Sequence, residues 1–286
     1  MHHQAAQEFL QDLPRVKNDL PFSTDVLQTL FFQTQEGSRA SLEEIGHTLT
    51  RDQGLSAKVL SMANSAFYGL QAQVTSIERA AAVLGLKEIR TMVMALGLKA
   101  LTDKRPLPPG FDLAGYWRHQ FQAGCIARRV GRGLGMPDPD ILFTAGLLHD
   151  LGKLVTALYR PEHWAAITEL VEAEDLSFAK AEDAYWGLDH GVVAALVLKS
   201  WDLPPTLVEP VNWHHAPHLA PEYAEAAALV GLADALAQRL DDPDAHHAGL
   251  ADAPPEILGL DADTAKAQAE EAVEAEAVES FVGLVA

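Results

Sequence analysis

Hydrophobic residues recur along most of the chain at the three- and four-residue spacing of an α-helix, and no segment shows a convincing strand-like alternation. Ser41 with Glu44, and Thr75 with Glu78, have the spacing of a capping box, which marks the start of a helix. The apolar positions after the first of these pairs are Leu42, Ile45 and Leu49. The pattern predicts an all-α, multi-helical fold.

The stretch 104–111, with three prolines and a glycine, cannot continue a helix. We expect it to connect an N-terminal helical half, 12–103, to a second half, 112–240, that packs against it. Asp112 has the residue type of an N-cap at the start of the second half. The helices predicted there are 112–134, 138–159, 161–173, 190–201 and 221–240.

Composition narrows the class of protein. A chain of 286 residues that is 48% hydrophobic can bury a substantial core, and its formal net charge of −19 opposes binding to nucleic acid or to an anionic membrane. The single cysteine, Cys125, excludes an internal disulfide and fits a reducing compartment. The N-terminus has no signal-peptide pattern and no apolar run has the length of a membrane span, so we expect a cytoplasmic protein.

The last segment, 241–286, is acidic and contains one basic residue, Lys266. We expect a loosely held loop followed by a helix over about 263–281. The apolar residues expected to dock this helix on the body are Val273, Val278, Phe281 and Val282. The acidity itself indicates only a solvated face.

Seven histidines and aspartates of the second half lie near predicted helices and could share a metal site. Imidazole nitrogens and carboxylate oxygens suit divalent cations, and a carboxylate can bridge two of them. The set is His119, His149, Asp150, His190, His214, His215 and Asp234.

His149 and Asp150 are neighbours in the sequence and would point about 100° apart on a helix. Both can therefore reach one ion only near the end of the helix. Lys153 returns to nearly the same face as Asp150 and would place an ammonium beside a metal-bound anion, which suits a phosphate. Asp150 as a helix cap, and Lys153 as a solvated side chain, are the alternative structural explanations.

The arrangement of these residues resembles a known family. His119 in Tyr-Trp-Arg-His, the run His149-Asp150-Leu-Gly-Lys153, and Asp234 in Gly-Leu-Ala-Asp are similar to the HD superfamily of metal-dependent phosphohydrolases. The signatures 60–69 (LSMANSAFYG), 77–85 (IERAAAVLG) and 201–204 (WDLP) are more closely similar to the HDOD domain. The resemblance covers about residues 12–240 and implies a bacterial signal-transduction protein.

HDOD domains generally lack part of the metal set, whereas this chain keeps all seven positions. By analogy with HD-GYP phosphodiesterases, which cleave cyclic dinucleotides, His119, His149, Asp150 and Asp234 would hold one metal. Asp150 would bridge to a second metal held by the remaining histidines, His190, His214 and His215. The Gly-Tyr-Pro motif of those enzymes is absent, and Gly115 stands where they often have a glutamate.

Two functions follow. In the first, which the resemblance favours, the domain is a regulatory module that binds a signalling protein or small ligand, and any metal braces the helices. In the second, which the complete ligand set favours, it is a phosphohydrolase of a phosphorylated small molecule or nucleotide. Asp150 and Lys153 would then act in catalysis, while one or two divalent ions would activate water and stabilise charge. Iron or manganese fits best, and zinc or nickel is compatible.

DNA binding is a third reading, because 41–64 is similar to a helix-turn-helix. Its second helix offers Lys58 as the only cation, so we do not expect DNA to be a partner.

Overall fold

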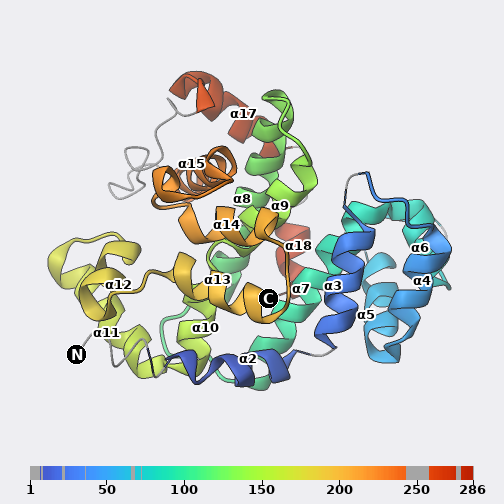
Figure 1. Ribbon diagram of the computed structural model, residues 1–286, viewed down its shortest axis with the longest axis horizontal. Coiled ribbons are helices and arrows are strands. Elements are labelled where there is room, and N and C mark those ends of the chain that lie inside the picture. Colours follow the sequence, from blue (N-terminus) through green and yellow to red (C-terminus); the bar gives the residue numbers. More distant parts are fainter. Residues whose placement is uncertain are drawn as a thin grey trace.

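The computed structural model describes residues 7, 9–20, 23–35, 37–65, 68–71, 73–242, 258–274 and 278–285. These residues form helices, turns and coil with no strand, so the all-α prediction is confirmed. Figure 1 shows the helices α3 to α6 gathered at one end of the molecule, with α7 between them and the remaining helices. Buried side chains from both ends belong to one continuous hydrophobic cluster.

The N-terminal half is built from short amphipathic helices and one long one. Its helices are α2 (Leu13–Asp19), α3 (Thr24–Gln33), α4 (Leu42–Thr50), α5 (Gln53–Ala63), α6 (Ile77–Leu84) and α7 (Leu86–Lys104). The capping box of Ser41 and Glu44 is present at the start of α4. The expected box at Thr75 is wrong: α6 begins one residue later, and Ser76, in extended backbone, accepts from the backbone N–H of Arg79.

The second half contains the remaining helices up to residue 241. They are α8 (Leu113–Gly133), α9 (Pro139–Leu148), α10 (Leu151–Tyr159), α11 (Pro161–Glu174), α12 (Phe178–Trp186), α13 (His190–Ser200), α14 (Pro205–Trp213), the 3₁₀ turn η1 (Pro217–Leu219) and α15 (Ala224–Asp241). Asp112 is the N-cap of α8, as expected, and accepts from the backbone N–H of Gly115.

Glycines allow α8 and α9 to pack with their backbones close together. A Cβ on Gly146 would lie 2.8 Å from the carbonyl oxygen of Ala123, and one on Gly124 would lie 2.9 Å from that of Phe143. Only glycine avoids these clashes. The close approach brings the two helices that carry His119 and His149 together.

The single helix predicted over 138–159 is wrong. The chain forms α9 and α10 instead, with a turn at His149 and Asp150 between them. The apolar run Pro139–Tyr159 has the length and composition of a membrane span, so the expectation that no run does is wrong. However, 94% of its most apolar window is buried inside the fold. The run therefore supplies part of the core.

The acidic segment packs on the body as two helices, α17 (Ala262–Glu274) and α18 (Val278–Val285), rather than the one helix expected over 263–281. Both contact α8 (Figure 1). The Phe281 ring stacks on that of Phe121 at 4.1 Å, and Arg118 pairs with Glu279 at 2.8 Å. The loop expected before these helices lies mostly outside the described residues.

The two halves meet through α2 and α7. Helix α2 packs against α13 as well as α7. The guanidinium of Arg90, on α7, is buried and lies 3.8 Å from the carboxylate of Asp138, which caps α9. The N-terminal half is thus packed on the half that carries the histidines.

Candidate metal centre

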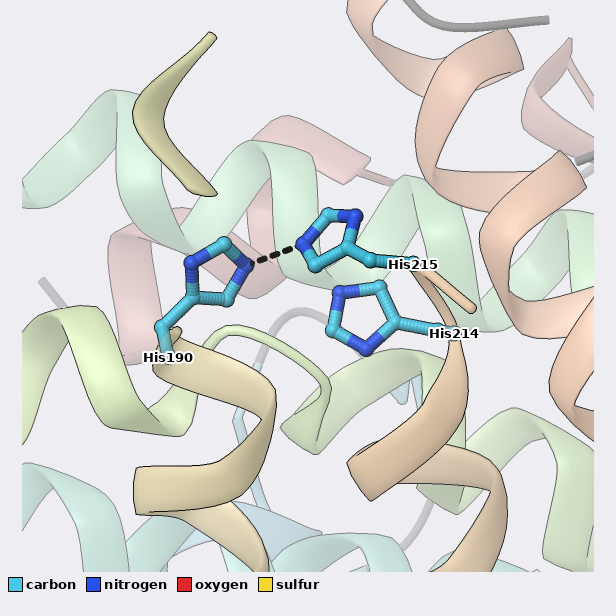
Figure 2. A group of neighbouring side chains, drawn as sticks. All are labelled: His190, His214 and His215. Carbon is cyan, nitrogen blue, oxygen red and sulfur yellow. Dashed lines mark hydrogen bonds between the residues drawn. The ribbon is translucent and has the colours of Figure 1, made fainter. Parts of the chain in front are cut away.

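The structure brings all seven predicted residues into one cluster. His119 lies within α8, His149 and Asp150 lie in the turn between α9 and α10, and Asp234 lies within α15. His190 is the first residue of α13, and His214 and His215 directly follow α14. Figure 2 shows the rings of these last three residues lying close together, from two different elements.

One group of donor atoms has the spacing of ligands around a single ion. His119 Nε2 lies 3.3 Å from His149 Nε2, 3.1 Å from Asp234 Oδ1 and 3.6 Å from Asp150 Oδ2. His149 Nε2 lies 3.5 Å from each of the two carboxylates. Ligands about 2.1 Å from one ion stand roughly 3.0–3.4 Å apart in octahedral or tetrahedral geometry. The five distances among these four side chains, 3.1–3.6 Å, lie within or slightly above that range.

The second group adjoins the first through Asp150. Its other oxygen, Oδ1, lies 2.9 Å from His190 Nε2, which lies 2.8 Å from His215 Nε2 (Figure 2). The ring of His214 stacks beside that of His215, with centroids 3.8 Å apart. Donor atoms of His214 also lie within 4.8 Å of those of His149 and Asp234, so His214 stands between the two groups.

Contacts behind the rings fix the direction in which the histidines face. His149 Nδ1 lies 2.7 Å from the carbonyl oxygen of Gly146, and His214 Nδ1 lies 2.7 Å from that of Val211. A carbonyl can only accept, so Nδ1 carries a proton in both rings and Nε2 faces the cluster, where it has a lone pair whenever the ring is neutral. This is the arrangement that metal-binding histidines ordinarily have.

His190 has a carboxylate in the same role. Glu182 Oε2 accepts from both the backbone N–H of His190, at 2.8 Å, and its Nδ1, at 2.6 Å. Glu182 is fully buried on α12, a helix that the sequence analysis did not predict. No spacing motif links it to His190, eight residues away, so only its position inside the fold identifies it.

The charges of the cluster keep the carboxylates ionised. Burial alone would raise the pKa of Asp150, but His149, Lys153 and His190 outweigh it and hold that pKa well below its usual value. Burial would likewise raise the pKa of Asp234, and hydrogen bonds from His119 and His149 hold it well below the usual value. Both carboxylates are therefore available as anionic ligands.

The histidines divide into two kinds. Burial and Lys153 would lower the pKa of His190, but Glu182 and Asp150 raise it to about 9. Burial, reinforced by neighbouring imidazoles, lowers the pKa of His214 to about 3 and that of His215 well below its usual value. His214 and His215 are thus neutral near pH 7, the form that binds metals.

The buried donor set fits a divalent metal. Nε2 of His214 is buried in the middle of the cluster and has no hydrogen-bond partner among the described residues. An unpaired buried nitrogen is costly, and a metal ion would satisfy its lone pair. Mixed imidazole and carboxylate donors of this kind suit iron, manganese, zinc or nickel.

The cluster lies at the wall of a cavity of about 460 Å³, within the range of small-molecule sites. The cavity is also lined by Lys153, whose Nζ donates to Asp150 Oδ2 at 2.8 Å. Burial would lower the pKa of Lys153, but Asp150 and Asp234 raise it, so the ammonium stays protonated.

Comparison with known proteins identifies the class. The family model for the HDOD domain matches residues 20–217, and the chain belongs to that family. A structure of a candidate phosphohydrolase from Shewanella amazonensis SB2B is similar, with 27% identity, a TM-score of 0.71 and coverage of 97% of this chain and 98% of the other.

Two further structures share the fold at 22% identity. One is an HDOD domain protein of unknown function from Geobacter sulfurreducens, with a TM-score of 0.70 and coverage of 98% of both chains. The other is a candidate signal-transduction protein from Marinobacter aquaeolei VT8, with a TM-score of 0.75 and coverage of 100% of this chain and 66% of that one. An uncharacterised protein of Treponema pallidum (strain Nichols) is 23% identical over 214 residues, and the match spans 72% of this chain but only 40% of that protein.

Proposed function

We propose that this HDOD protein is a metal-dependent phosphohydrolase. The observation that carries the proposal is the position of the two donor groups, which meet at Asp150 and lie at the wall of an open cavity beside Lys153. Structural metal sites are closed by protein ligands, whereas catalytic sites keep a position open to substrate. Bound there, divalent ions would supply a water of low pKa and neutralise charge on a phosphoryl ester.

The protein's own residues have separate roles in this proposal. His119, His149, Asp150 and Asp234 would hold one ion, and His190, His214 and His215 would hold the other beside Asp150. Lys153 keeps its proton and donates to a phosphoryl oxygen, adding a fixed positive charge where negative charge develops. Glu182 orients His190 and does not touch substrate.

The test is hydrolysis of p-nitrophenyl phosphate and bis(p-nitrophenyl) phosphate by the whole chain, purified without chelator and supplied with Mn²⁺ or Fe²⁺. We expect turnover that Asp150→Ala abolishes and that Lys153→Gln lowers by about 100-fold in kcat. Lys180→Gln, at an exposed lysine on α12, is the matched control and should leave kcat unchanged. A metal-loaded chain that hydrolyses neither ester would refute the proposal.

The second candidate is a signalling module in which the metal only braces the fold. It is supported by the spread of the seven ligands over α8, the α9–α10 turn, α13, the end of α14 and α15, because one ion would tie these distant segments together. In that case the wild-type chain would hydrolyse no phosphoester, and Asp150→Ala would lower only its thermal stability.

A further inference from the structure

We propose that the cavity beside the metal centre binds a nucleoside monophosphate, with the phosphate at Lys153 and the base against a row of aromatic rings. The position of the phosphate rests on the proposed phosphohydrolase function. The position of the base rests on a separate part of the cavity wall. That part is formed by four residues of the lining, Phe111, Tyr116, Trp164 and Phe178.

The four rings form a continuous row. Phe111 lies 5.7 Å from Tyr116 and 5.0 Å from Trp164, measured between ring centroids, and Trp164 lies 4.9 Å from Phe178. The row comes from the segment before α8, from α8 itself, from α11 and from the start of α12. A flat apolar group could therefore meet a ring surface over much of this wall.

The row leads to the phosphate end of the cavity. The Phe178 ring lies 6.2 Å from the ring of His190, measured between centroids. Lys153 Nζ lies 5.5 Å from the centroid of the Phe178 ring. A ligand that places an anionic group at Lys153 thus has aromatic surface directly beside it. Anion and aromatic ring in one small molecule are the chemistry of a nucleotide.

The rings are not simply core residues. All four are half-buried and line the cavity, whereas Trp117 and Trp186, which serve only the core, are 0% and 1% exposed. Aromatic rings left partly accessible beside a charged site are typical of base-stacking platforms.

The charged side chains of the cavity wall favour one phosphate beside Lys153 rather than two. Among the described lining residues Lys153 is the only lysine or arginine, while Asp112 adds a carboxylate at the wall near Phe111. A second phosphate, as in a cyclic dinucleotide, would find no further cationic side chain there and would meet that carboxylate.

Isothermal titration of the Mn²⁺-loaded whole chain tests the inference, with AMP (or its phosphonate analogue if AMP is turned over), ribose 5-phosphate and inorganic phosphate as ligands. Stacking of one base gives about 1–3 kcal/mol, so AMP should bind roughly 5- to 150-fold tighter than ribose 5-phosphate. Trp164→Leu should reduce that preference by more than it changes the affinity for inorganic phosphate. Trp164→Tyr should restore most of it, which separates stacking from a general loss of packing.

Equal affinity for AMP and ribose 5-phosphate in the wild-type chain would overturn the inference, as would tighter binding of a cyclic dinucleotide than of AMP. The two proposals fail differently. If AMP is preferred but no ester is hydrolysed, the proposed catalysis is wrong and the ligand assignment stands. If esters are hydrolysed but AMP binds no tighter than ribose 5-phosphate, the ligand assignment is wrong and the catalysis stands.

Discussion

Replacing Glu182 by Gln probes the second donor group without touching a metal ligand. Glu182 Oε2 accepts two hydrogen bonds from His190, and only the one from Nδ1, at 2.6 Å, acts on the imidazole that faces the cluster. The amide of Gln can still accept from Nδ1, but it removes the negative charge that makes the imidazole a better electron donor.

The expected magnitude follows from that single bond. A hydrogen bond to a charged group contributes about 1.5–3 kcal/mol and a neutral one about 0.5–1.5, so the exchange costs about 1–1.5 kcal/mol of metal binding. That is roughly a tenfold increase in Kd at the second group. Glu182→Ala removes the partner altogether and should raise Kd by about 100-fold.

The assay is a titration of chelator-treated protein with Mn²⁺, compared between wild type, Glu182→Gln and the control Asp183→Asn. Asp183 is the exposed neighbour of Glu182 on α12, so its substitution should change nothing. Because Glu182 helps Asp150 to raise the pKa of His190, the loss of Glu182 also weakens competition by protons. The deficit should therefore be larger above pH 9 than at pH 7. An unchanged Kd in Glu182→Gln at both pH values would refute the reasoning.

Three further predictions concern packing, protons and the C-terminal helices. Gly152→Ala should weaken metal binding and cost about 1–3 kcal/mol of stability, because a Cβ would lie 2.1 Å from the carbonyl oxygen of His190; Gly283→Ala, with nothing within 4 Å, is the control. Metal binding at pH 7 should release protons, since His190 has a pKa of about 9 and must lose its proton, and calorimetric titration in buffers of different ionisation enthalpy measures that release. The metal affinity should also rise with pH up to about 9. Phe281→Ala should destabilise the fold by about 3 kcal/mol in chemical denaturation, whereas Glu279→Gln, which breaks an exposed ion pair, should leave stability nearly unchanged.

Each of these has a contradicting result. If Gly152→Ala has the same stability and the same Mn²⁺ affinity as Gly283→Ala, α10 and α13 are free to separate. Metal affinity that does not rise from pH 6 to pH 8 would show that His190 carries no proton to release. Equal stability of the Phe281 and Glu279 variants would show that α18 is not held by its buried ring.

The helical class and most helix positions could be predicted from the sequence because capping residues and apolar spacing are local signals. The turn between α9 and α10 could not, since the apolar run continues through His149 and Asp150 without a proline or glycine at the turn. Its cause is tertiary, because the backbone there turns where both side chains enter the cluster.

The seven residues were selected by type as a possible metal site, and the family resemblance supported the choice, because nothing in the spacing of residues 119 and 234 requires them to meet. The structure places their donor atoms close together. The residues that support the site were not predicted, because no local motif in the sequence marks them. Glu182 and the rings of Trp164 and Phe178 belong to α11 and α12, and their contacts with the site exist only in the folded chain.

Thermal unfolding of chelator-treated protein, with and without added Mn²⁺ or Fe²⁺, tests the metal centre most directly. An ion at 100 times its Kd stabilises the native state by about 2.7 kcal/mol, so the midpoint should rise by about 5 °C or more, and Asp150→Ala should abolish the rise. A midpoint that no divalent transition metal moves, in a chain that is folded and free of metal, would contradict the account.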